Sequence, residues 1–220
     1  MEHPLLRRML QHGIVGVVRT PTPETAARAV EAVVSGGIKV VEITFTVPNA
    51  TKVLETVAAS TGNDVVLGAG TITDSEKAKA AIGAGARFIV APNTDPATIA
   101  TAHALGAIAI PGALTPTEVV MAMNASADAV KVFPISVFGP SYLKALRAPL
   151  PDVVFMPTGG VEPNNVFDYL AAGAQLLGAG GTLVEPKHIA TGNYEAIAQK
   201  ARSFADAYNE AMARLSSNRS

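Results

Sequence analysis

Lys131 is the only charged residue in the apolar run from Ala129 to Pro134. A lysine inside a buried strand is costly unless it is paired or neutral, and burial favours the neutral amine. A neutral amine can attack a ketone and form an imine, which is nucleophilic catalysis. The alternative is a lysine at a strand end whose head reaches solvent or a structural carboxylate. This residue alone does not separate the two interpretations.

Glu42 is the second residue that could do chemistry. Side chains alternate along a strand, so Glu42 shares one face with Val40 and Thr44, whereas the opposite face is wholly apolar and suits packing beneath helices. Glu42 should therefore point to the interior. There it is either a general acid or base, or a buried partner for an arginine or lysine. Together with Lys131 it makes a coherent pair, an amine that forms an imine and a carboxyl group that moves its protons.

An arginine and two pairs of glycines could bind an anion. Arg19 ends an apolar run, where its guanidinium could hold a carboxylate or phosphate, although an exposed loop arginine is common. Gly159-Gly160 and Gly180-Gly181 each follow an apolar run, and glycine lets backbone N–H groups approach an anion. Glycine also simply makes turns. The segment from Gly68 to Thr71 lacks the dinucleotide spacing and the lysine of a P-loop, so neither motif is predicted.

The elements that would position these residues alternate along the chain. Eight short apolar runs are strand candidates, and their starts are 20 to 26 residues apart. Each run is too short for a helix and suits a strand buried on both faces. The predicted strands are Ile14–Arg19, Lys39–Thr44, Val65–Gly68, Arg87–Val90, Ala107–Ile110, Asp128–Val132, Val153–Pro157 and Ala174–Gly178.

Ala-rich segments between these runs carry helix-start and helix-stop residues. The predicted helices are Thr25–Val34, Ala50–Ala59, Glu76–Ile82, Ala97–Leu105, Thr117–Met123 and Asn164–Ala172, with extra helices at Pro4–Gln11 and Asn193–Leu215. Alternating strands and helices predict parallel βαβ units. Eight units favour an α/β fold in one domain over residues 1–220, a single compact (β/α)₈ TIM barrel with an extra N-terminal helix and a C-terminal helix. A doubly wound open sheet is the main competitor. In such a barrel the active site lies at the C-terminal ends of the strands, where the candidate residues stand.

Composition excludes several classes of protein. The 220 residues are 49% hydrophobic and 16% charged, which fits a folded domain with a sizeable core. A net charge of −1 gives no reason to expect a nucleic-acid partner. There is no cysteine, and no two of the four histidines have ligand spacing, so no metal site and no cofactor are predicted. No apolar run approaches about 18 residues and the first ten residues do not form a signal sequence, which predicts a cytoplasmic protein without a membrane partner.

Six segments resemble the 2-keto-3-deoxy-6-phosphogluconate (KDPG) aldolases, a family that includes 4-hydroxy-2-oxoglutarate aldolases. They are Val41–Pro48, Gly68–Thr71, Phe88–Pro92, Ile110–Gly112, Val130–Pro134 and Pro157–Val161. The resemblance covers nearly the whole chain in order. It implies a class I aldolase on a (β/α)₈ barrel that is usually a homotrimer and uses no metal. By position, Lys131 matches the Schiff-base lysine and Glu42 the general acid/base.

The resemblance also implies substrate contacts. Thr71 matches the threonine that helps hold the pyruvate carboxylate, Pro92 and Phe133 match residues that line the site, and Gly159 and Gly160 match the glycines on the phosphate side.

Three positions depart from the family pattern. Thr46 stands where many members carry arginine, and Arg19 is expected to take that role. Gly181, followed by Thr182, stands where a serine usually contacts phosphate, and Ala91-Pro92-Asn93 replaces the common Ser-Pro-Gly or Ser-Pro-His.

The resemblance implies cleavage of KDPG to pyruvate and glyceraldehyde 3-phosphate. A non-phosphorylated or dicarboxylate substrate such as 4-hydroxy-2-oxoglutarate is the alternative, and the stereochemical preference at C4 stays open. Two interpretations of another class remain: a catalytically silent barrel that binds a phosphorylated metabolite, and a metal-dependent aldolase, which the missing ligand cluster disfavours. The partners are therefore small 2-keto acids and aldehydes.

Overall fold

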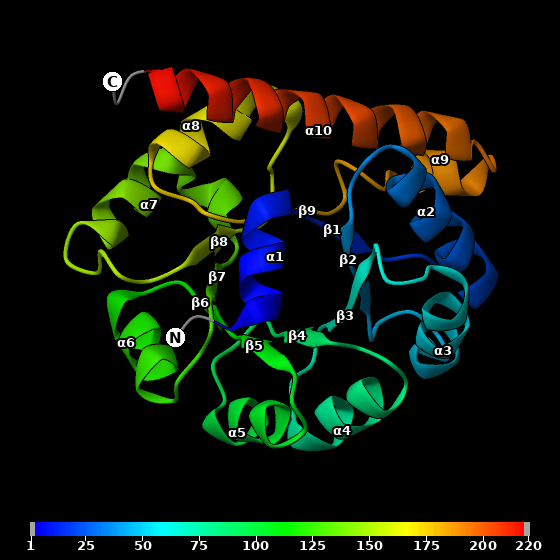
Figure 1. Ribbon diagram of the computed structural model, residues 1–220, viewed down its shortest axis with the longest axis horizontal. Helices are drawn as coiled ribbons and strands as arrows, with labels where there is room; N and C mark the ends of the chain where they lie inside the picture. The colour runs from blue at the N-terminus through cyan, green and yellow to red at the C-terminus, as the bar shows by residue number, and fades with distance from the viewer. Residues whose placement is uncertain (1–2, 218–220) are drawn as a thin grey trace.

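Parallel strands and helices alternate through residues 3–217, the part of the chain that the computed structural model describes (Figure 1). The strands are β1 (Ile14–Val18), β2 (Val40–Thr44), β3 (Val66–Gly70), β4 (Phe88–Val90), β5 (Ile108–Ile110), β6 (Gly112–Ala113), β7 (Val130–Val132), β8 (Phe155–Pro157) and β9 (Leu177–Ala179). The α-helices are α1 (Pro4–His12), α2 (Pro23–Ser35), α3 (Ala50–Ser60), α4 (Ser75–Gly83), α5 (Pro96–Ala104), α6 (Pro116–Asn124), α7 (Gly139–Arg147), α8 (Val166–Ala171), α9 (Pro186–Ala190) and α10 (Tyr194–Ser217). Two 3₁₀ turns, η1 (Ile135–Val137) and η2 (Pro163–Asn165), complete the described chain.

The strands form two parallel sheets. The six-stranded sheet has the order β5-β4-β3-β2-β1-β9 and the three-stranded sheet the order β6-β7-β8. The sheets meet at both ends, because β5 continues into β6 through Pro111 and Thr158 forms an isolated parallel bridge with Gly178. The predicted α/β class with parallel strands is confirmed. The fifth predicted strand is followed by a separate piece, β6, because Pro111 has no N–H with which to continue the ladder.

All six predicted internal helices are present, but two further helices were not predicted. Helix α7 begins with Gly139-Pro140, a dipeptide typical of turns, and Phe138 before it provides no side-chain cap. Helix α9 spans only 5 residues, too few to show a helical period. The predicted helix Asn164–Ala172 is divided into the 3₁₀ turn η2 and helix α8.

Capping side chains explain where the predicted helices begin. Asp74 accepts from the Lys77 amide at 2.8 Å, and Asp95 accepts from the Thr98 amide at 3.0 Å. Thr115 begins α6 with a capping box in which the Glu118 carboxylate accepts from the Thr115 amide at 2.7 Å. Each cap satisfies an amide that lacks an intrahelical partner.

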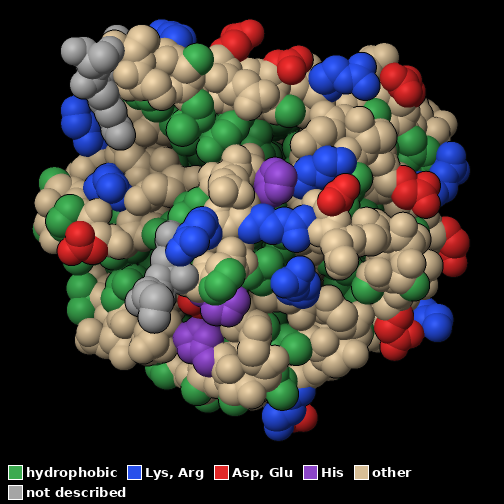
Figure 2. Space-filling view, in the orientation of Figure 1, with side chains coloured by type: hydrophobic (Ala, Val, Ile, Leu, Met, Phe, Trp, Pro, Cys, Tyr) green, Lys and Arg blue, Asp and Glu red, His purple; other side chains and the backbone are tan. Residues whose placement is uncertain are grey.

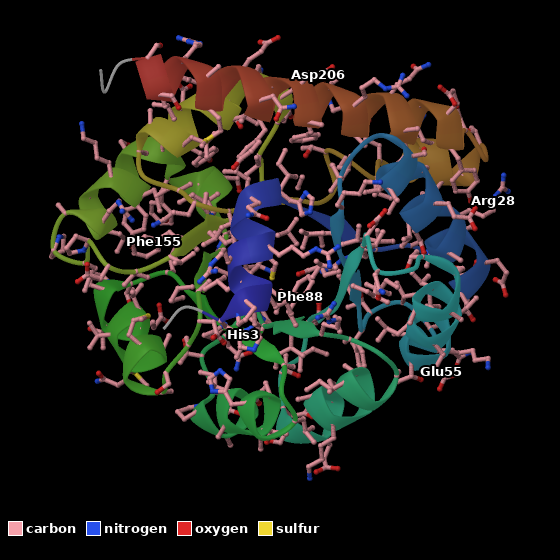
Figure 3. The ribbon with its side chains drawn as sticks, viewed as in Figure 1. His3, Arg28, Glu55, Phe88, Phe155 and Asp206 are labelled. Atoms are coloured by element: carbon pink, nitrogen blue, oxygen red, sulfur yellow. The ribbon has the colours of Figure 1, made fainter. Side chains whose placement is uncertain are left out.

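The core has an inner and an outer part. The inner cluster contains the strand residues Val15, Val40, Val66 and Phe88 together with Met9 of α1, whereas the outer cluster joins the other strand faces to the helices. Figure 1 shows α1 lying across the middle of the molecule. In Figure 3, Phe88 lies at the centre beside α1, while the labelled side chains on α2, α3 and α10 lie at the periphery. Helix α1 thus covers the N-terminal ends of the strands and leaves their C-terminal ends for a site.

The face covered by α1 carries several Lys, Arg and His side chains (Figure 2). His12, the last residue of α1, is partly buried there. Burial lowers the pKa of His12, and the nearby charges of Arg8 and Lys39 lower it further. No helix among residues 3–217 is long and apolar enough to cross a membrane.

Candidate active site

A cavity of about 530 Å³ lies at the C-terminal ends of the strands. Nine of the ten predicted site residues line it: Arg19, Thr71, Pro92, Lys131, Phe133, Gly159, Gly160, Gly180 and Gly181. They come together because each lies in, or directly after, a parallel strand whose carboxyl end faces the same way. The tenth, Glu42, lies deeper in β2.

Lys131 lies in the middle of β7 and reaches the cavity from the inner face of the sheet. Its amide donates to the Pro111 carbonyl at 2.9 Å, which fixes the backbone beneath the side chain. The side chain is buried, with 7% exposed, and Nζ lies 4.9 Å from the centre of the Phe133 ring. Among residues 3–217, no carboxylate lies within the 4.0 Å of Nζ that would define an ion pair. Lys131 and Glu42 therefore form no direct ion pair within the described chain, although the charge of Lys131 acts on Glu42.

Glu42 is almost completely buried, with 1% exposed, and points to the inner face of β2 as predicted. Its Oε2 has no hydrogen-bond partner in the described chain. Burial raises the pKa of Glu42, and the charges of Lys131 and Arg19 oppose that effect without overcoming it. A carboxyl group that is biased toward its protonated form, and whose oxygen is not engaged elsewhere, is suited to give and take a proton.

Gly70 makes room for the Glu42 carboxyl group. A Cβ at position 70 would lie 2.3 Å from Oε1 of Glu42, far inside ordinary contact. The backbone conformation does not demand glycine here, since Gly70 does not have a positive φ. Gly70 is therefore explained by the space that the neighbouring carboxyl group occupies.

Arg19 and Thr71 lie at the mouths of β1 and β3. Arg19 is exposed, shares the inner face of its strand with Val17, and faces the cavity. Thr71 has φ 61°, a left-handed conformation that is unusual for a β-branched residue. Such a conformation costs about 1–3 kcal/mol and is held only where the surrounding structure demands it. The Ile72 amide donates to the Val90 carbonyl at 3.1 Å and ties this turn to β4.

The turn after β8 presents backbone to the cavity. Gly159 and Gly160 have φ 98° and 71°, so both need glycine. Asn165 Nδ2 donates to the Gly160 carbonyl at 2.9 Å, and Thr182 Oγ1 donates to the Val161 carbonyl at 2.6 Å. These two bonds anchor the carbonyl groups of the turn to side chains from outside it.

Two glycines, one within β9 and one in the turn after it, have different surroundings. A Cβ at Gly178 would lie 2.1 Å from Oγ1 of Thr158, so these neighbouring strands approach too closely for any side chain. A Cβ at Gly181 would meet nothing within 4 Å, so that position opens into free space.

Four residues of the cavity wall were not predicted: Val17, Thr158, Val184 and Pro186. Strand alternation could have found Val17, since it lies two residues before Arg19 on the same face. Thr158 lies within the Pro157–Val161 motif, but the motif implies no role for it. Val184 and Pro186 flank Glu185, and their own side chains carry no group that signals chemistry.

The fold and the cavity define a parallel α/β protein with a buried amine and a buried carboxyl group on its strands, near a cavity at the carboxyl ends of those strands. This combination is suited to lysine-based chemistry on a carbonyl substrate. The chain belongs to the KDPG and KHG aldolase family, whose model matches residues 6–200. The family resemblance carried by the sequence motifs is confirmed.

Three individual relatives show how far the similarity extends. The 2-dehydro-3-deoxy-6-phosphogalactonate aldolase of Escherichia coli is 36% identical over 200 residues, which cover 90% of this chain and 96% of that protein. The 2-dehydro-3-deoxy-phosphogluconate aldolase of Treponema pallidum is 33% identical over 185 residues, 84% of this chain and 88% of that protein. A solved structure of KDPG aldolase from Legionella pneumophila, with pyruvate captured as a covalent carbinolamine, has a TM-score of 0.81 and 27% identity, and covers 87% of this chain and 93% of that one.

Proposed function

We propose that this chain is a class I aldolase that cleaves a 2-keto-3-deoxy-6-phospho sugar acid to pyruvate and glyceraldehyde 3-phosphate. The observation that carries the proposal is the buried Lys131 amine in the cavity, close enough to buried Glu42 for its charge to act on that carboxyl group. Membership of the aldolase family supports it, as does the similarity to an aldolase in which pyruvate was captured as a carbinolamine.

The first half of the reaction forms the imine. The neutral Lys131 amine attacks the C2 ketone carbon, and the ketone oxygen takes up a proton to give a carbinolamine. Protonated Glu42 then donates a proton to the departing hydroxyl group, directly or through a water. Loss of water leaves a protonated imine between Nζ and C2. This covalent step replaces one high barrier with several lower ones.

The second half breaks the carbon–carbon bond. The Glu42 carboxylate, now deprotonated, removes the proton of the C4 hydroxyl group while the C3–C4 electron pair moves toward the imine nitrogen. Glyceraldehyde 3-phosphate leaves as the aldehyde, and an enamine remains on Lys131. Protonation at C3 and addition of water then release pyruvate and the free amine, which restores both groups.

Binding groups at the two ends of the cavity orient the substrate for this sequence. Arg19 and Thr71 hold the carboxylate and so keep the ketone carbon near Nζ of Lys131. The backbone amides after β8 and β9, at the two glycine pairs, face the other end and bind the phosphate group.

Two substrates that differ in configuration at C4 are the main candidates. The relative at 36% identity acts on the phosphogalactonate compound, and the relative at 33% identity acts on KDPG, the substrate that the sequence motifs imply. We put the phosphogalactonate compound first because of the higher identity and keep KDPG second. A dicarboxylate such as 4-hydroxy-2-oxoglutarate is the third.

Steady-state kinetics with all three compounds tests the proposal, with pyruvate release as the readout. We expect turnover of a phosphorylated sugar acid with the highest kcat/KM, and loss of turnover in Lys131→Ala. Turnover of none of the three, or full activity of the folded Lys131→Ala protein, would overturn the proposed function. A higher kcat/KM for the dicarboxylate would overturn only the phosphate assignment.

We further propose that the two sheets act as one closed (β/α)₈ barrel and that the protein is a homotrimer. The junctions at Pro111 and at the Thr158–Gly178 bridge support closure. The large apolar side chains Met121 and Val137, which are 49% and 71% exposed, support burial of surface between copies. Light scattering coupled to size-exclusion chromatography would give the oligomeric mass, and a monomer would refute the trimer. The cytoplasmic location stays a prediction.

A further inference from the structure

The proposed phosphate end of the cavity has few side-chain donors. Gly159, Gly160, Gly180 and Gly181 carry no side chain at all. The nearby hydroxyl of Thr182 is engaged, since it donates to the Val161 carbonyl at 2.6 Å. A phosphate group presents several strong acceptors, so a free hydroxyl beside the glycine turn would be used.

Ser136 is in contact with this turn. It lies in η1, and its Cβ is 2.9 Å from the place that a Cβ on Gly160 would occupy. Its Oγ is 3.8 Å from the corresponding place on Gly159, and two ring carbons of Phe133 lie at the same distance from that place. Phe133 and Gly159 both line the cavity, so the Ser136 hydroxyl lies beside two residues of its wall.

The Ser136 hydroxyl is available while its backbone is held in place. Within residues 3–217, Oγ of Ser136 makes no hydrogen bond to another group, and the residue is exposed. The preceding residue, Ile135, is fully buried, and its amide donates to the Thr158 carbonyl at 3.1 Å. The Phe138 amide donates back to the Ile135 carbonyl at 3.0 Å. A hydroxyl without an internal partner on a fixed turn loses little freedom when it binds a ligand.

We propose that Ser136 is a specificity-determining residue, whose hydroxyl donates to the substrate phosphate as that phosphate lies on the Gly159–Gly160 turn. This assignment rests on the proposed function and adds to it a residue that recognises the phosphate. Ser136 is given no part in the bond-breaking steps, which are assigned to Lys131 and Glu42. It therefore acts on substrate choice and leaves imine formation unchanged.

The test compares Ser136→Ala with the wild type on two substrates, the preferred phosphorylated sugar acid and its counterpart without the phosphate group. A hydrogen bond to a charged group that is partly exposed is worth about tenfold in binding. We expect kcat/KM for the phosphorylated substrate to fall about tenfold, chiefly through KM, and kcat/KM for the other substrate to stay within about twofold. Ser136→Thr keeps a hydroxyl and should retain most of the activity.

Two further variants sharpen the comparison. Ser136→Asp places a negative charge beside the phosphate and should reduce turnover of the phosphorylated substrate more than Ser136→Ala does, because like charges repel. Ser203→Ala removes a serine on the outer helix α10, whose hydroxyl bonds only to its own helix, and should change neither substrate.

The outcomes separate this inference from the proposed function. If the wild type cleaves the phosphorylated substrate but Ser136→Ala loses nothing, or loses equally on both substrates, the role of Ser136 is refuted and the aldolase assignment stands. If the wild type cleaves neither substrate, both proposals fail. A loss confined to the phosphorylated substrate, with rescue by Ser136→Thr, supports the inference.

Discussion

Replacement of Gly70 by alanine would displace the Glu42 carboxyl group without altering any group that reacts. A methyl carbon at position 70 would lie 2.3 Å from Oε1 and 2.8 Å from Cδ of Glu42, whereas ordinary contact begins at 3.4 Å. The carboxyl oxygen must therefore move by about 1 Å. A displacement of that size costs about 10²-fold in rate when the group takes part in the chemistry. We expect Gly70→Ala to lower kcat about 100-fold, with a loss of about 1–3 kcal/mol in unfolding free energy from overpacking.

The assay is pyruvate release at saturating substrate, with urea unfolding measured on the same samples. Gly83→Ala is the matched control, because a Cβ there meets nothing within 4 Å and Gly83 lies at the end of α4. The control should keep the wild-type kcat and should be no less stable, since alanine favours helix over glycine. A folded Gly70→Ala protein with the wild-type kcat would show that the position of the Glu42 carboxyl group does not matter to catalysis, contrary to this prediction.

Three other changes have expected outcomes. Glu42→Gln should lower kcat by about 10²–10⁴-fold. The same variant should remove a pH effect on stability. Because the folded-state pKa of Glu42 is raised above 4.5, the wild type should lose stability relative to Glu42→Gln as the pH rises from 4.5. Urea unfolding of both proteins between pH 4 and 8 would measure this difference. A constant difference across that range would contradict this. Gly178→Ala should cost about 1–3 kcal/mol, since its Cβ would overlap the Thr158 hydroxyl, and a melting temperature equal to the wild type would argue against the close strand approach. The pKa of His12 is lowered from 6.5, so the protein should lose stability as pH falls through 6.5, and His12→Gln should weaken that loss in thermal melts; an unchanged pH profile would be the contrary result.

Much of the fold could be predicted because its strands are buried on both faces. Short apolar runs at a regular spacing are typical of such strands, and the predicted strand boundaries agree with the structure to within a few residues. Helix α7 was missed because Gly139-Pro140 marks a turn in most sequences, and no polar cap marks its start. The break between β5 and β6 is a consequence of Pro111, which has no backbone N–H. Whether this interrupts the sheet depends on whether a neighbouring strand needs a hydrogen-bond donor at that position.

The candidate site was predictable where burial conflicts with residue type. Lys131 and Glu42 stand out because a charged group inside an apolar strand is costly unless the protein uses it. The left-handed φ of Thr71 and the space that Gly70 leaves for Glu42 could not be predicted, because both depend on neighbouring strands. The same holds for the contact of Ser136 with the glycine turn, since η1 and β8 meet only in the folded chain.

Intact mass after incubation with pyruvate and borohydride, beside a Lys131→Ala sample, shows whether Lys131 forms the imine. Borohydride reduces an imine to a stable amine, so a lysine that forms the imine is permanently labelled. We expect the wild type to gain the mass of one reduced pyruvate and folded Lys131→Ala to gain none. A folded wild type without the label, or equal labelling of both proteins, would contradict the assignment of Lys131 as the imine-forming residue.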